Sequence, residues 1–396
     1  MINKTLDTIE KPAIISKNNF QFKSLSDWSY NISVGCLHGC SFCYVPQTST
    51  IKQEVTLEAI PGLIPQSWIA ERQAGQHWGD QHWGEYALLR TWDEQKFRSS
   101  LRKAKNTTRL SPDGNRAIMF CTTTDPYQTL SIPGNPARTR LMQDRRKGLV
   151  RRALEIILND SDLNVRILTR SPLAEQDFDL YQQFGSRLLF GMSIPTLDDS
   201  LSQIYEPNAP GPQAKLRTLE RAVAAGIHVF VALAPTLPDE GEAELRTTID
   251  TIAAFNPVTI FHEPINLRAE NVARIQAKAQ ALGRTINSNV FLSRETWREY
   301  AFKQFNLVDK IAGDLNLPAG VLHQWPDKTL GSKAGFLQMK AMQAERESGM
   351  PFSKELREAA VAEWNSLVRP WLEYWHNPVE RISAWPTESQ PPVAQG

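Results

Sequence analysis

Three cysteines lie close together near the start of the chain, at Cys36, Cys40 and Cys43. They form a C-x3-C-x2-C loop directly after Ser29–Ser33, which we expect to be a strand. Three thiolates on one short loop can each bind one iron of a [4Fe–4S] cubane, and the fourth iron is then open to a small chelating molecule. An electron-transfer ferredoxin would need a fourth nearby cysteine, but the remaining one, Cys121, lies far along the chain. The spacing therefore predicts a cluster with one open iron.

Structural zinc is the alternative, with the same three cysteines and His38 as the ligands of a tetrahedral site. His38 falls between the first two cysteines, which is a crowded position for such a site. The preceding strand and the aromatic Phe42 favour the cluster instead. Gly35 and Gly39 would let the backbone fold closely around it.

Polar side chains follow several other apolar runs. In enzymes built on parallel strands and helices, the active-site residues lie at the carboxyl ends of the strands. In Thr122–Gln128, Thr123 and Asp125 can accept hydrogen bonds from an ammonium group, although Asp-Pro is also a common turn signal. Arg170 can bind a carboxylate through its planar fork, or form a surface ion pair. Ser193 can bond a ligand hydroxyl or carboxylate, or be an ordinary buried serine.

Two further positions could act on a substrate. Cys121 ends the second expected strand, where its thiol could donate a hydrogen atom to a bound substrate, although most free cysteines are small buried hydrophobes. Glu263 and Asn266 could orient a substrate, and His262 could move a proton. Hydrogen bonding at a strand end is the alternative for these three residues.

The elements that must position these residues alternate along the chain. We expect six strands, at Ser29–Ser33, Ala117–Thr122, Val165–Thr169, Leu188–Ile194, His228–Ala234 and Val258–His262. Between and after them we expect helices at Leu141–Leu158, Leu173–Phe184, Gln213–Ala225, Glu242–Phe255 and Ala269–Leu282. This alternation predicts an α/β fold with a parallel sheet. Since six strands are too few for a closed eight-stranded barrel, we expect a partial (β/α)6 barrel.

The domain organisation follows from changes in this pattern. We expect an N-terminal extension over 1–28, the barrel over 29–315 with a Trp-rich insertion at about 51–110, and a helical C-terminal region over 316–385. Val321–Gly331 reads as a loop, followed by helices at Ser332–Ser348 and Lys354–Trp375. The tail, 386–396, has a composition typical of disorder.

Composition excludes some classes of function and leaves others open. The chain has 396 residues, with 44 Lys and Arg against 43 Asp and Glu, so its net charge of +1 gives no whole-protein argument for nucleic acid. We find no apolar run of about 18 residues that would span a membrane, and no signal peptide. Tight clustering of the cysteines argues for metal rather than disulfides, so we expect a cytoplasmic protein without a membrane partner.

The cysteine motif, with an aromatic residue before its last cysteine, resembles that of the radical S-adenosylmethionine (SAM) superfamily. The resemblance implies a partial barrel, SAM chelated to the open iron through its amino and carboxylate groups, and reductive cleavage to a 5′-deoxyadenosyl radical. It places Phe42, flanked by Tyr44, near the adenine. It also places Arg170 against the SAM carboxylate and Ser193 near the ribose or carboxylate. The Gly-Gly-Glu stretch that binds the amino group in many relatives is missing here, so Thr123 and Asp125 are our candidates for that task.

A narrower resemblance covers Ser29 to Glu263, and the segments that carry it are SYNISVGCLHGCSFCYVP, HWGEYALLR, TTTDPYQ, ILTRS, LLFGMSIPTLDD, YEPNAPGPQAKLRTLERAVAAGI and LAPTLP. In this order they resemble the spore photoproduct lyase-related group, also called DNA repair photolyase-like. The resemblance implies a low-potential electron donor of flavodoxin or ferredoxin type. It also makes a lesion in nucleic acid a candidate substrate.

Two other functions stay open. A different orientation of SAM would release a 3-amino-3-carboxypropyl group for transfer, and methylthioadenosine would then replace 5′-deoxyadenosine as the product. Alternatively, the chain binds nucleic acid without turnover, using zinc or a cluster for stability. Tryptophans interleaved with arginines, such as Trp78, Trp83 and Trp92, could stack on exposed bases. At helical spacing, Trp364, Trp371 and Trp375 more simply pack the last helix onto the barrel.

Overall fold

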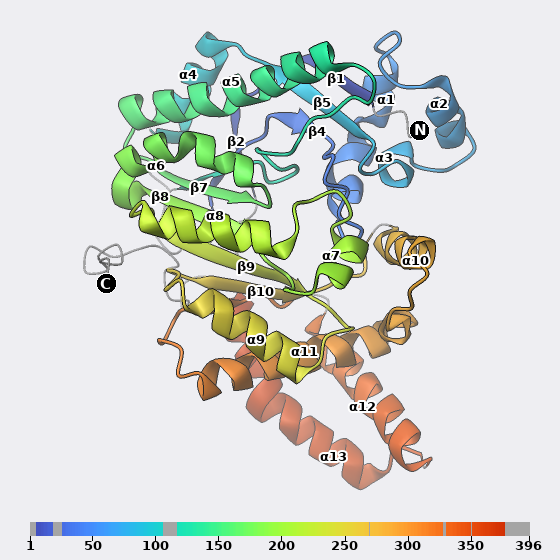
Figure 1. Cartoon of the computed structure of the whole chain (residues 1–396). Coiled ribbons are helices and arrows are strands. Elements are labelled where there is room, and N and C mark those ends of the chain that lie inside the picture. Colours follow the sequence, from blue (N-terminus) through green and yellow to red (C-terminus); the bar gives the residue numbers. More distant parts are fainter. Residues whose placement is uncertain are drawn as a thin grey trace.

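The computed structural model describes residues 5–18, 26–105, 117–268, 270–327, 330–349 and 351–376. Two β-sheets, flanked by helices, make a mixed α/β structure (Figure 1). Within these ranges, none of the helices combines the length and the apolar character needed to cross a bilayer.

The larger sheet has eight strands, and their chain order from β3 to β11 is also their spatial order. Each neighbouring pair from β3 to β11 is parallel, and β2 joins the edge antiparallel to β3. Because these strands run in one direction, the loops that follow them meet at the same edge of the sheet. The strands are β2 (Ile15–Lys17), β3 (Trp28–Tyr30), β6 (Ala117–Phe120), β7 (Asn164–Thr169), β8 (Leu188–Ser193), β9 (Val229–Thr236), β10 (Ile260–Pro264) and β11 (Leu322–Gln324).

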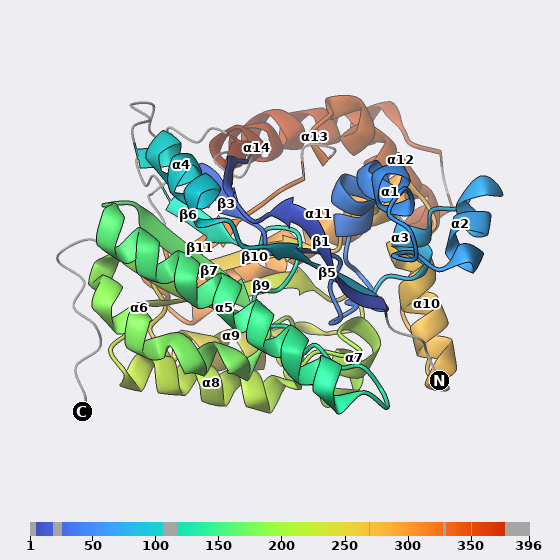
Figure 2. The same cartoon turned by 90° about the horizontal axis from the view of Figure 1, so that it is seen from above.

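Both faces of this sheet are buried, which is why its strands read as continuous apolar runs. One face carries Ile118, Val165 and Val231, which belong to the main core with residues of the covering helices. The alternate residues, such as Met119 and Phe230, form a smaller cluster on the other face. Helices α5, α6 and α8 lie on one side of the strands and the C-terminal helices on the other (Figure 2). The connecting helices are α4 (Glu94–Lys105), α5 (Pro136–Asp160), α6 (Phe178–Phe184), α7 (Asp199–Tyr205), α8 (Pro212–Ala224), α9 (Glu242–Ala253), α10 (Asn271–Ala281) and α11 (Arg294–Asp314).

A second, three-stranded sheet stands beside the cysteine loop. In it β5 (Tyr86–Thr91) is central, with β1 (Thr5–Pro12) parallel on one side and β4 (Ser33–Val34) antiparallel on the other. Together with the short helices α1 (Glu54–Glu58), α2 (Gln66–Gln73) and α3 (Trp78–Gln81), it forms what we call the N-terminal lobe. Sequence analysis gave no strand to either 1–28 or 51–110, because β1 and β5 become strands by pairing with each other across the chain.

The six expected strands are all present and adjacent, whereas several other elements were missed. Strand β11 lies in the segment expected to be a loop, and β2 lies in the expected extension; each has only three residues. The long helix α11 was also missed. Barrel closure is not seen, since in the described part of the chain β2 and β11 are the two end strands of an open order.

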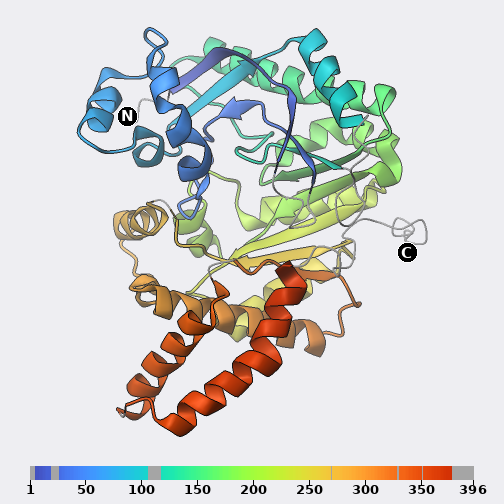
Figure 3. The same cartoon turned by 180° about the vertical axis from the view of Figure 1, so that it is seen from behind.

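The C-terminal region is helical, as expected, and projects from one end of the molecule (Figure 3). It consists of α12 (Lys333–Ser348), α13 (Lys354–Glu363) and α14 (Arg369–His376), the last two joined by a π-helical turn at Trp364–Val368. Phe336, Trp364 and Val368 form its own small core, and the Trp371 ring lies 5.0 Å from the ring of Phe305 on α11. Packing is therefore the role of Trp364 and Trp371. The expected disordered tail, 386–396, lies outside the described residues.

Candidate active site

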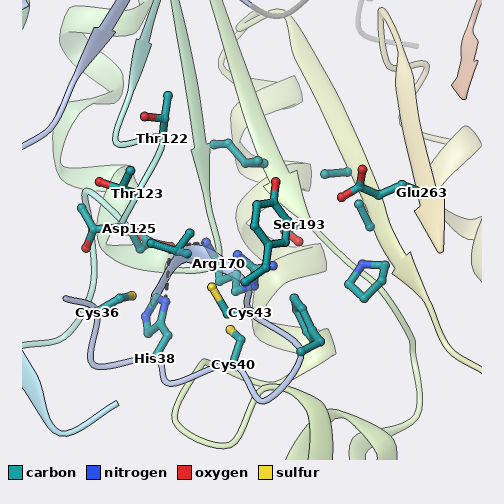
Figure 4. A pocket seen from close by; sticks show the side chains of 18 of the residues that line it. Cys36, His38, Cys40, Cys43, Thr122, Thr123, Asp125, Arg170, Ser193 and Glu263 are labelled. Atoms are coloured by element: carbon teal, nitrogen blue, oxygen red, sulfur yellow. Dashed lines mark hydrogen bonds and ion pairs between the residues drawn. The ribbon is translucent and has the colours of Figure 1, made fainter. Parts of the chain in front are cut away.

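One cavity at the C-terminal edge of the parallel strands is lined by the predicted site residues, with the exception of His262 (Figure 4). Its empty volume, counted out to its open mouth, is about 1160 Å³. The predicted residues along its wall are Cys36, Cys40, Phe42, Cys43, Tyr44, Cys121, Thr123, Asp125, Arg170, Ser193 and Glu263. They come from the cysteine loop after β4 and from the ends of β6, β7, β8 and β10.

The three cysteines of the loop are free thiols that face this cavity (Figure 4). Cys36 and Cys40 are buried, and Cys43 is half-buried. Within the described ranges, no three His, Cys, Asp or Glu side chains are close enough to hold a single metal ion. A tetrahedral zinc site needs four donors on one point, whereas a cubane takes one thiolate at each of three separate irons. Three thiols on one cavity wall are the donors that a cluster with one open iron would use.

Burial makes these thiols hard to ionise without a bound cation. It raises the pKa of Cys36 and of Cys40 to about 12, and that of Cys43 to about 11. Arg170 acts in the opposite direction on Cys40, as Arg274 does on Cys43. Metal binding and thiol deprotonation are coupled, so a bound cation would favour the thiolate forms.

The N-terminal lobe holds the cysteine loop in place by close backbone contact. Gly35 and Gly39 have φ of +87° and +56°, the left-handed region that favours glycine. A Cβ on Gly39 would lie 2.9 Å from the Cα of Gly84, and one on Gly35 would overlap the ring of Tyr86. The loop and the lobe can approach this closely only because glycines meet at the contact.

Arg274 on α10 fastens the loop from the other side. Its guanidinium donates to the carbonyl of Cys43 and, at 3.3 Å, to that of Ser41, and it also pairs with Asp80 of the lobe. Sequence analysis missed both Arg274 and Asp80. No local signal marks them, since their partners lie far away along the chain.

Asp125 is held by the protein itself. One oxygen accepts from the Tyr127 N–H at 2.8 Å, which is the expected Asx turn, and from the hydroxyl of Thr169 at 2.7 Å. The other accepts from the Arg170 N–H at 2.8 Å and lies 3.3 Å from Nδ1 of His38. Burial alone would raise the pKa of Asp125, but these partners lower it to about 2. Asp125 is therefore a charged anchor for the cavity wall, and His38 pairs with it rather than with the cysteines.

The neighbouring threonines are anchored in a similar way. Thr123 donates its hydroxyl and its backbone N–H to the side-chain oxygen of Asn31, at 3.0 and 3.1 Å. Thr124 donates to the carbonyl of Gly35 at 2.7 Å. This segment thus ties the end of β6 to the start of the cysteine loop.

Arg170 forms a buried ion pair rather than the surface pair that was the alternative. Its Nε donates to Glu206, whose other oxygen receives the ammonium of the fully buried Lys215. Burial works against its charge, but Cys40 and Glu206 raise the pKa of Arg170 further. The guanidinium also lies 5.5 Å from the ring centre of Phe42. Glu206 begins the connection at 206–212 that follows α7, and sequence analysis gave no role in the site to Glu206 or Lys215.

The same connection covers the cysteine loop. Asn208 donates from its side chain to the carbonyl of Leu37 at 3.1 Å, and from its backbone to that of His38 at 3.3 Å. The connection after α7 therefore acts as a wall of the site.

Ser193 and Cys121 present polar atoms to the cavity without strong competition. The Ser193 hydroxyl is buried and has no hydrogen-bond partner among the residues described. Cys121 has a φ of +59°, an uncommon conformation for a residue with a side chain, and such strain gathers at functional sites. Burial raises the pKa of Cys121, which keeps it as a thiol.

His262 lies away from the cavity, so its expected proton-transfer role is wrong. Successive residues of β10 point to opposite faces, which sends Glu263 to the cavity and His262 into the protein. There its ring bonds Gln324 at 2.8 Å and Thr236 at 3.1 Å. Burial lowers the pKa of His262 to about 4, so it stays neutral.

The tryptophans of the N-terminal half pack inside the protein instead of forming exposed base-stacking platforms. Trp78 is fully buried and donates to Glu58 at 2.9 Å. The ring of Trp92 lies 5.0 Å from that of Phe97. Trp83 is buried too, and lines the cavity.

No known protein-family model matches the sequence. It is 26% identical over 262 residues to the uncharacterised protein ORF301 of Acidianus two-tailed virus, covering 64% of this chain and 73% of the viral protein. It is also 29% identical over 112 residues to the uncharacterised protein MJ0683 of Methanocaldococcus jannaschii, which covers 28% of this chain and 41% of that protein.

The comparison with solved structures finds similarity over a larger part of the chain. Spore photoproduct lyase complexed with dinucleoside spore photoproduct superposes with a TM-score of 0.52 and 12% identity, covering 81% of each chain. A mutant of that enzyme with bound AdoMet (SAM) and the same dinucleoside superposes with a TM-score of 0.51, also at 12% identity, covering 81% of this chain and 80% of that one. At this identity the likeness concerns the fold. The chain therefore has the fold of the radical SAM enzymes to which spore photoproduct lyase belongs.

Proposed function

We propose that this chain is a radical SAM enzyme that cleaves SAM reductively at a [4Fe–4S] cluster. One observation carries the proposal. A single cavity gathers three thiols, a half-buried arginine and a buried serine from distant parts of the sequence. The same fold in spore photoproduct lyase supports the general class.

In this proposal Cys36, Cys40 and Cys43 hold the cluster, and SAM binds beside it. Arg170 binds the SAM carboxylate. Its Nε donates to Glu206, and its two Nη groups would donate to the carboxylate. Phe42 stacks beneath that guanidinium and would pack near the adenine. When bound, the reduced cluster with SAM supplies a 5′-deoxyadenosyl radical, which abstracts hydrogen from a substrate.

The remaining predicted positions take supporting roles around SAM. The unpartnered hydroxyl of Ser193 bonds the ribose or the carboxylate. Tyr44 flanks the adenine. Both oxygens of Asp125 already accept hydrogen bonds from the protein. Asp125 therefore attracts the SAM amino group by its negative charge, and Thr123 lines the cavity beside it.

The substrate end of the cavity is formed by Cys121, Glu263 and Asn266, beside apolar residues such as Met119 and Trp325. In spore photoproduct lyase the dinucleoside is a bound lesion. A lesion in nucleic acid is therefore our candidate substrate, reached as an extruded base. Cys121 donates a hydrogen atom to the substrate-derived radical and becomes a thiyl radical, which regains hydrogen from 5′-deoxyadenosine. Glu263 orients the substrate.

The proposal also covers the shape of the sheet, the electron donor and the location of the protein. The sheet curves into a partial barrel around SAM, as the resemblance implies. The cluster receives its electron from a low-potential flavodoxin- or ferredoxin-type donor, and a cytoplasmic location suits this chemistry.

Anaerobic reconstitution tests the class of enzyme. We expect a brown protein with about four irons per chain, whose reduced electron paramagnetic resonance (EPR) spectrum changes when SAM is added. After dithionite reduction, 5′-deoxyadenosine should accumulate. Replacing Cys36, Cys40 and Cys43 by alanine should abolish the iron, whereas Cys121→Ala should retain it. A colourless zinc protein would refute the proposal.

The product also decides between two radical reactions. The missing Gly-Gly-Glu stretch and the engaged oxygens of Asp125 leave the orientation of the SAM amino group open to a different arrangement. Methylthioadenosine in place of 5′-deoxyadenosine would identify transfer of a 3-amino-3-carboxypropyl group.

Cys121→Ala tests the hydrogen donor. The substitution should leave 5′-deoxyadenosine formation intact and change the distribution of substrate-derived products, because the substrate radical then loses its quencher. Mass spectrometry of the products measures this. An unchanged product distribution would assign Cys121 to packing alone.

A further inference from the structure

Trp83 lines the same cavity as the three cysteines of the loop. It comes from the N-terminal lobe and is 8% exposed. It belongs to the same hydrophobic cluster as Cys36, with Cys43 packed at the edge of that cluster, and it lines the cavity that the thiols face. The indole therefore shares both a cavity and an apolar cluster with two of the proposed ligands of the iron–sulfur cluster.

The Trp83 Nε1–H finds no acceptor among the residues that the structure describes, although it is buried. An indole nitrogen can only donate, and buried donors are nearly always paired, because an unpaired one loses its bond to water without replacement. Two other buried tryptophans show the usual pairing: Trp78 donates to Glu58 at 2.9 Å, and Trp297 donates to the carbonyl of Ile265 at 2.7 Å. Trp83 thus carries a buried donor beside a site that is built for a ligand.

The backbone around Trp83 is fixed to the cysteine loop. Gly84, the next residue, meets Gly39 so closely that a Cβ on either would lie 2.9 Å from the other's Cα. Arg274 and Asp80 join the loop and the lobe at a second point. The indole is therefore held at a set position relative to Cys36 and Cys43.

We propose that the Trp83 Nε1–H donates a hydrogen bond to a sulfur of the bound [4Fe–4S] cluster, and that it raises the cluster's reduction potential. This inference rests on the proposed function, since it requires the cluster. The acceptor is a cysteine thiolate or a bridging sulfide. A donor to sulfur stabilises the more negative, reduced cluster more than the oxidised one, and such bonds are one of the main controls of cluster potential. The Trp-rich insertion then contributes to electron uptake.

Trp83→Phe tests the proposal, with Trp68→Phe as the matched control. Phe keeps an aromatic ring in the cluster of apolar side chains and removes the N–H. Trp68 is 5% exposed and lies in the same hydrophobic cluster, but it does not line the cavity. In an EPR-monitored redox titration of reconstituted protein without SAM, Trp83→Phe should shift the midpoint potential to a more negative value, whereas Trp68→Phe should match the wild type.

A second measurement uses the wild-type protein, in case Trp83→Phe does not retain a cluster. With ¹⁵N-indole-labelled tryptophan, electron-nuclear double resonance of the reduced cluster should show one ¹⁵N coupling, which persists in Trp68→Phe. Its absence in the wild type, or an unchanged midpoint potential in a cluster-bearing Trp83→Phe, would overturn the inference while leaving the proposed function standing. Failure of the wild type to assemble any cluster would instead overturn the proposed function.

Discussion

At the scale of single residues, the cavity combines side chains that are engaged with one another and side chains that have polar atoms to spare. Asp125 and Thr123 use their oxygens within the chain. Ser193 and Trp83 each keep one buried polar atom without a partner in the described structure. The sequence gives the residue types. Whether a polar atom has a hydrogen-bond partner depends on residues that come close only when the chain folds.

Arg170 offers a direct test of carboxylate binding. We expect Arg170→Met to weaken SAM binding about 10- to 150-fold, because a charge-assisted hydrogen bond contributes about 1.5–3 kcal/mol. Isothermal titration of the cluster-loaded protein measures it. Arg138→Met, which removes an exposed pair with Asp7 away from the cavity, is the control. Equal affinity in the wild type and Arg170→Met would remove Arg170 from the binding site.

Glu240 predicts a pH dependence of stability. It is buried, with one oxygen accepting from Thr196 at 2.6 Å and the other unpaired within the described residues. Burial raises the pKa of Glu240 to about 7 from its ordinary 4.5. The folded state therefore keeps a proton that the unfolded state loses, so the group's contribution to stability is complete below pH 4.5 and is lost as pH rises towards 7.

We expect Glu240→Gln to remove this loss, because the amide cannot ionise and still accepts from Thr196. The free energy of unfolding of Glu240→Gln relative to wild type should rise across this range by at most about 3 kcal/mol. Denaturant unfolding at pH 5 and pH 8 measures it. The exposed Glu220→Gln should show no such change, and neither should Glu240→Gln if its carboxyl titrates normally.

At the scale of elements, the cysteine loop works only as part of a three-way contact. β4 leads into it from the second sheet, the connection after α7 covers it through Asn208, and α10 fastens it through Arg274. The spacing of the three cysteines is a local property of the chain, so the sequence was enough to predict the cysteine loop as a site. The elements that hold it are far apart in the chain, so the sequence did not predict them.

The contact between Gly39 and Gly84 predicts different effects for two glycine substitutions. Gly39→Ala should reduce the iron bound per chain, since its Cβ would press on the backbone of Gly84 and separate the loop from the lobe. Gly62→Ala has a similar positive φ of +73° but nothing within 4 Å of its Cβ, so it bears only the conformational cost of about 1–2 kcal/mol. Iron analysis after reconstitution compares the two. Equal iron contents would show that the close approach is dispensable.

At the scale of the whole molecule, the C-terminal helices have a small core of their own, and Trp371 also packs on α11. The cavity lies at the edge of the large sheet beside the lobe. Helices α12–α14 project from one end of the molecule (Figures 1 and 3). Stability and cluster binding should therefore respond to different substitutions.

Trp364→Ala should destabilise the C-terminal helices by about 3–5 kcal/mol, the usual cost of deleting a buried tryptophan. The same protein should bind as much iron as the wild type. Leu367→Ala, whose side chain is 66% exposed in the same turn, should change stability by less than about 0.5 kcal/mol. Thermal unfolding and iron analysis test both. Loss of iron in Trp364→Ala would show that the two parts are coupled.

The sequence by itself determined the cysteine loop, the six neighbouring parallel strands and the polar residues at their ends, because spacing and apolar periodicity are local properties of a chain. It could not determine which strand pairs across the chain, as β1 does with β5, nor the short edge strand β11. The tertiary structure alone decided that His262 turns inward while Glu263 turns to the cavity, and that Glu206 and Lys215 hold Arg170. Hydrogen bonds and ion pairs between distant residues form only once the chain is folded, so their partners leave no mark in the local sequence.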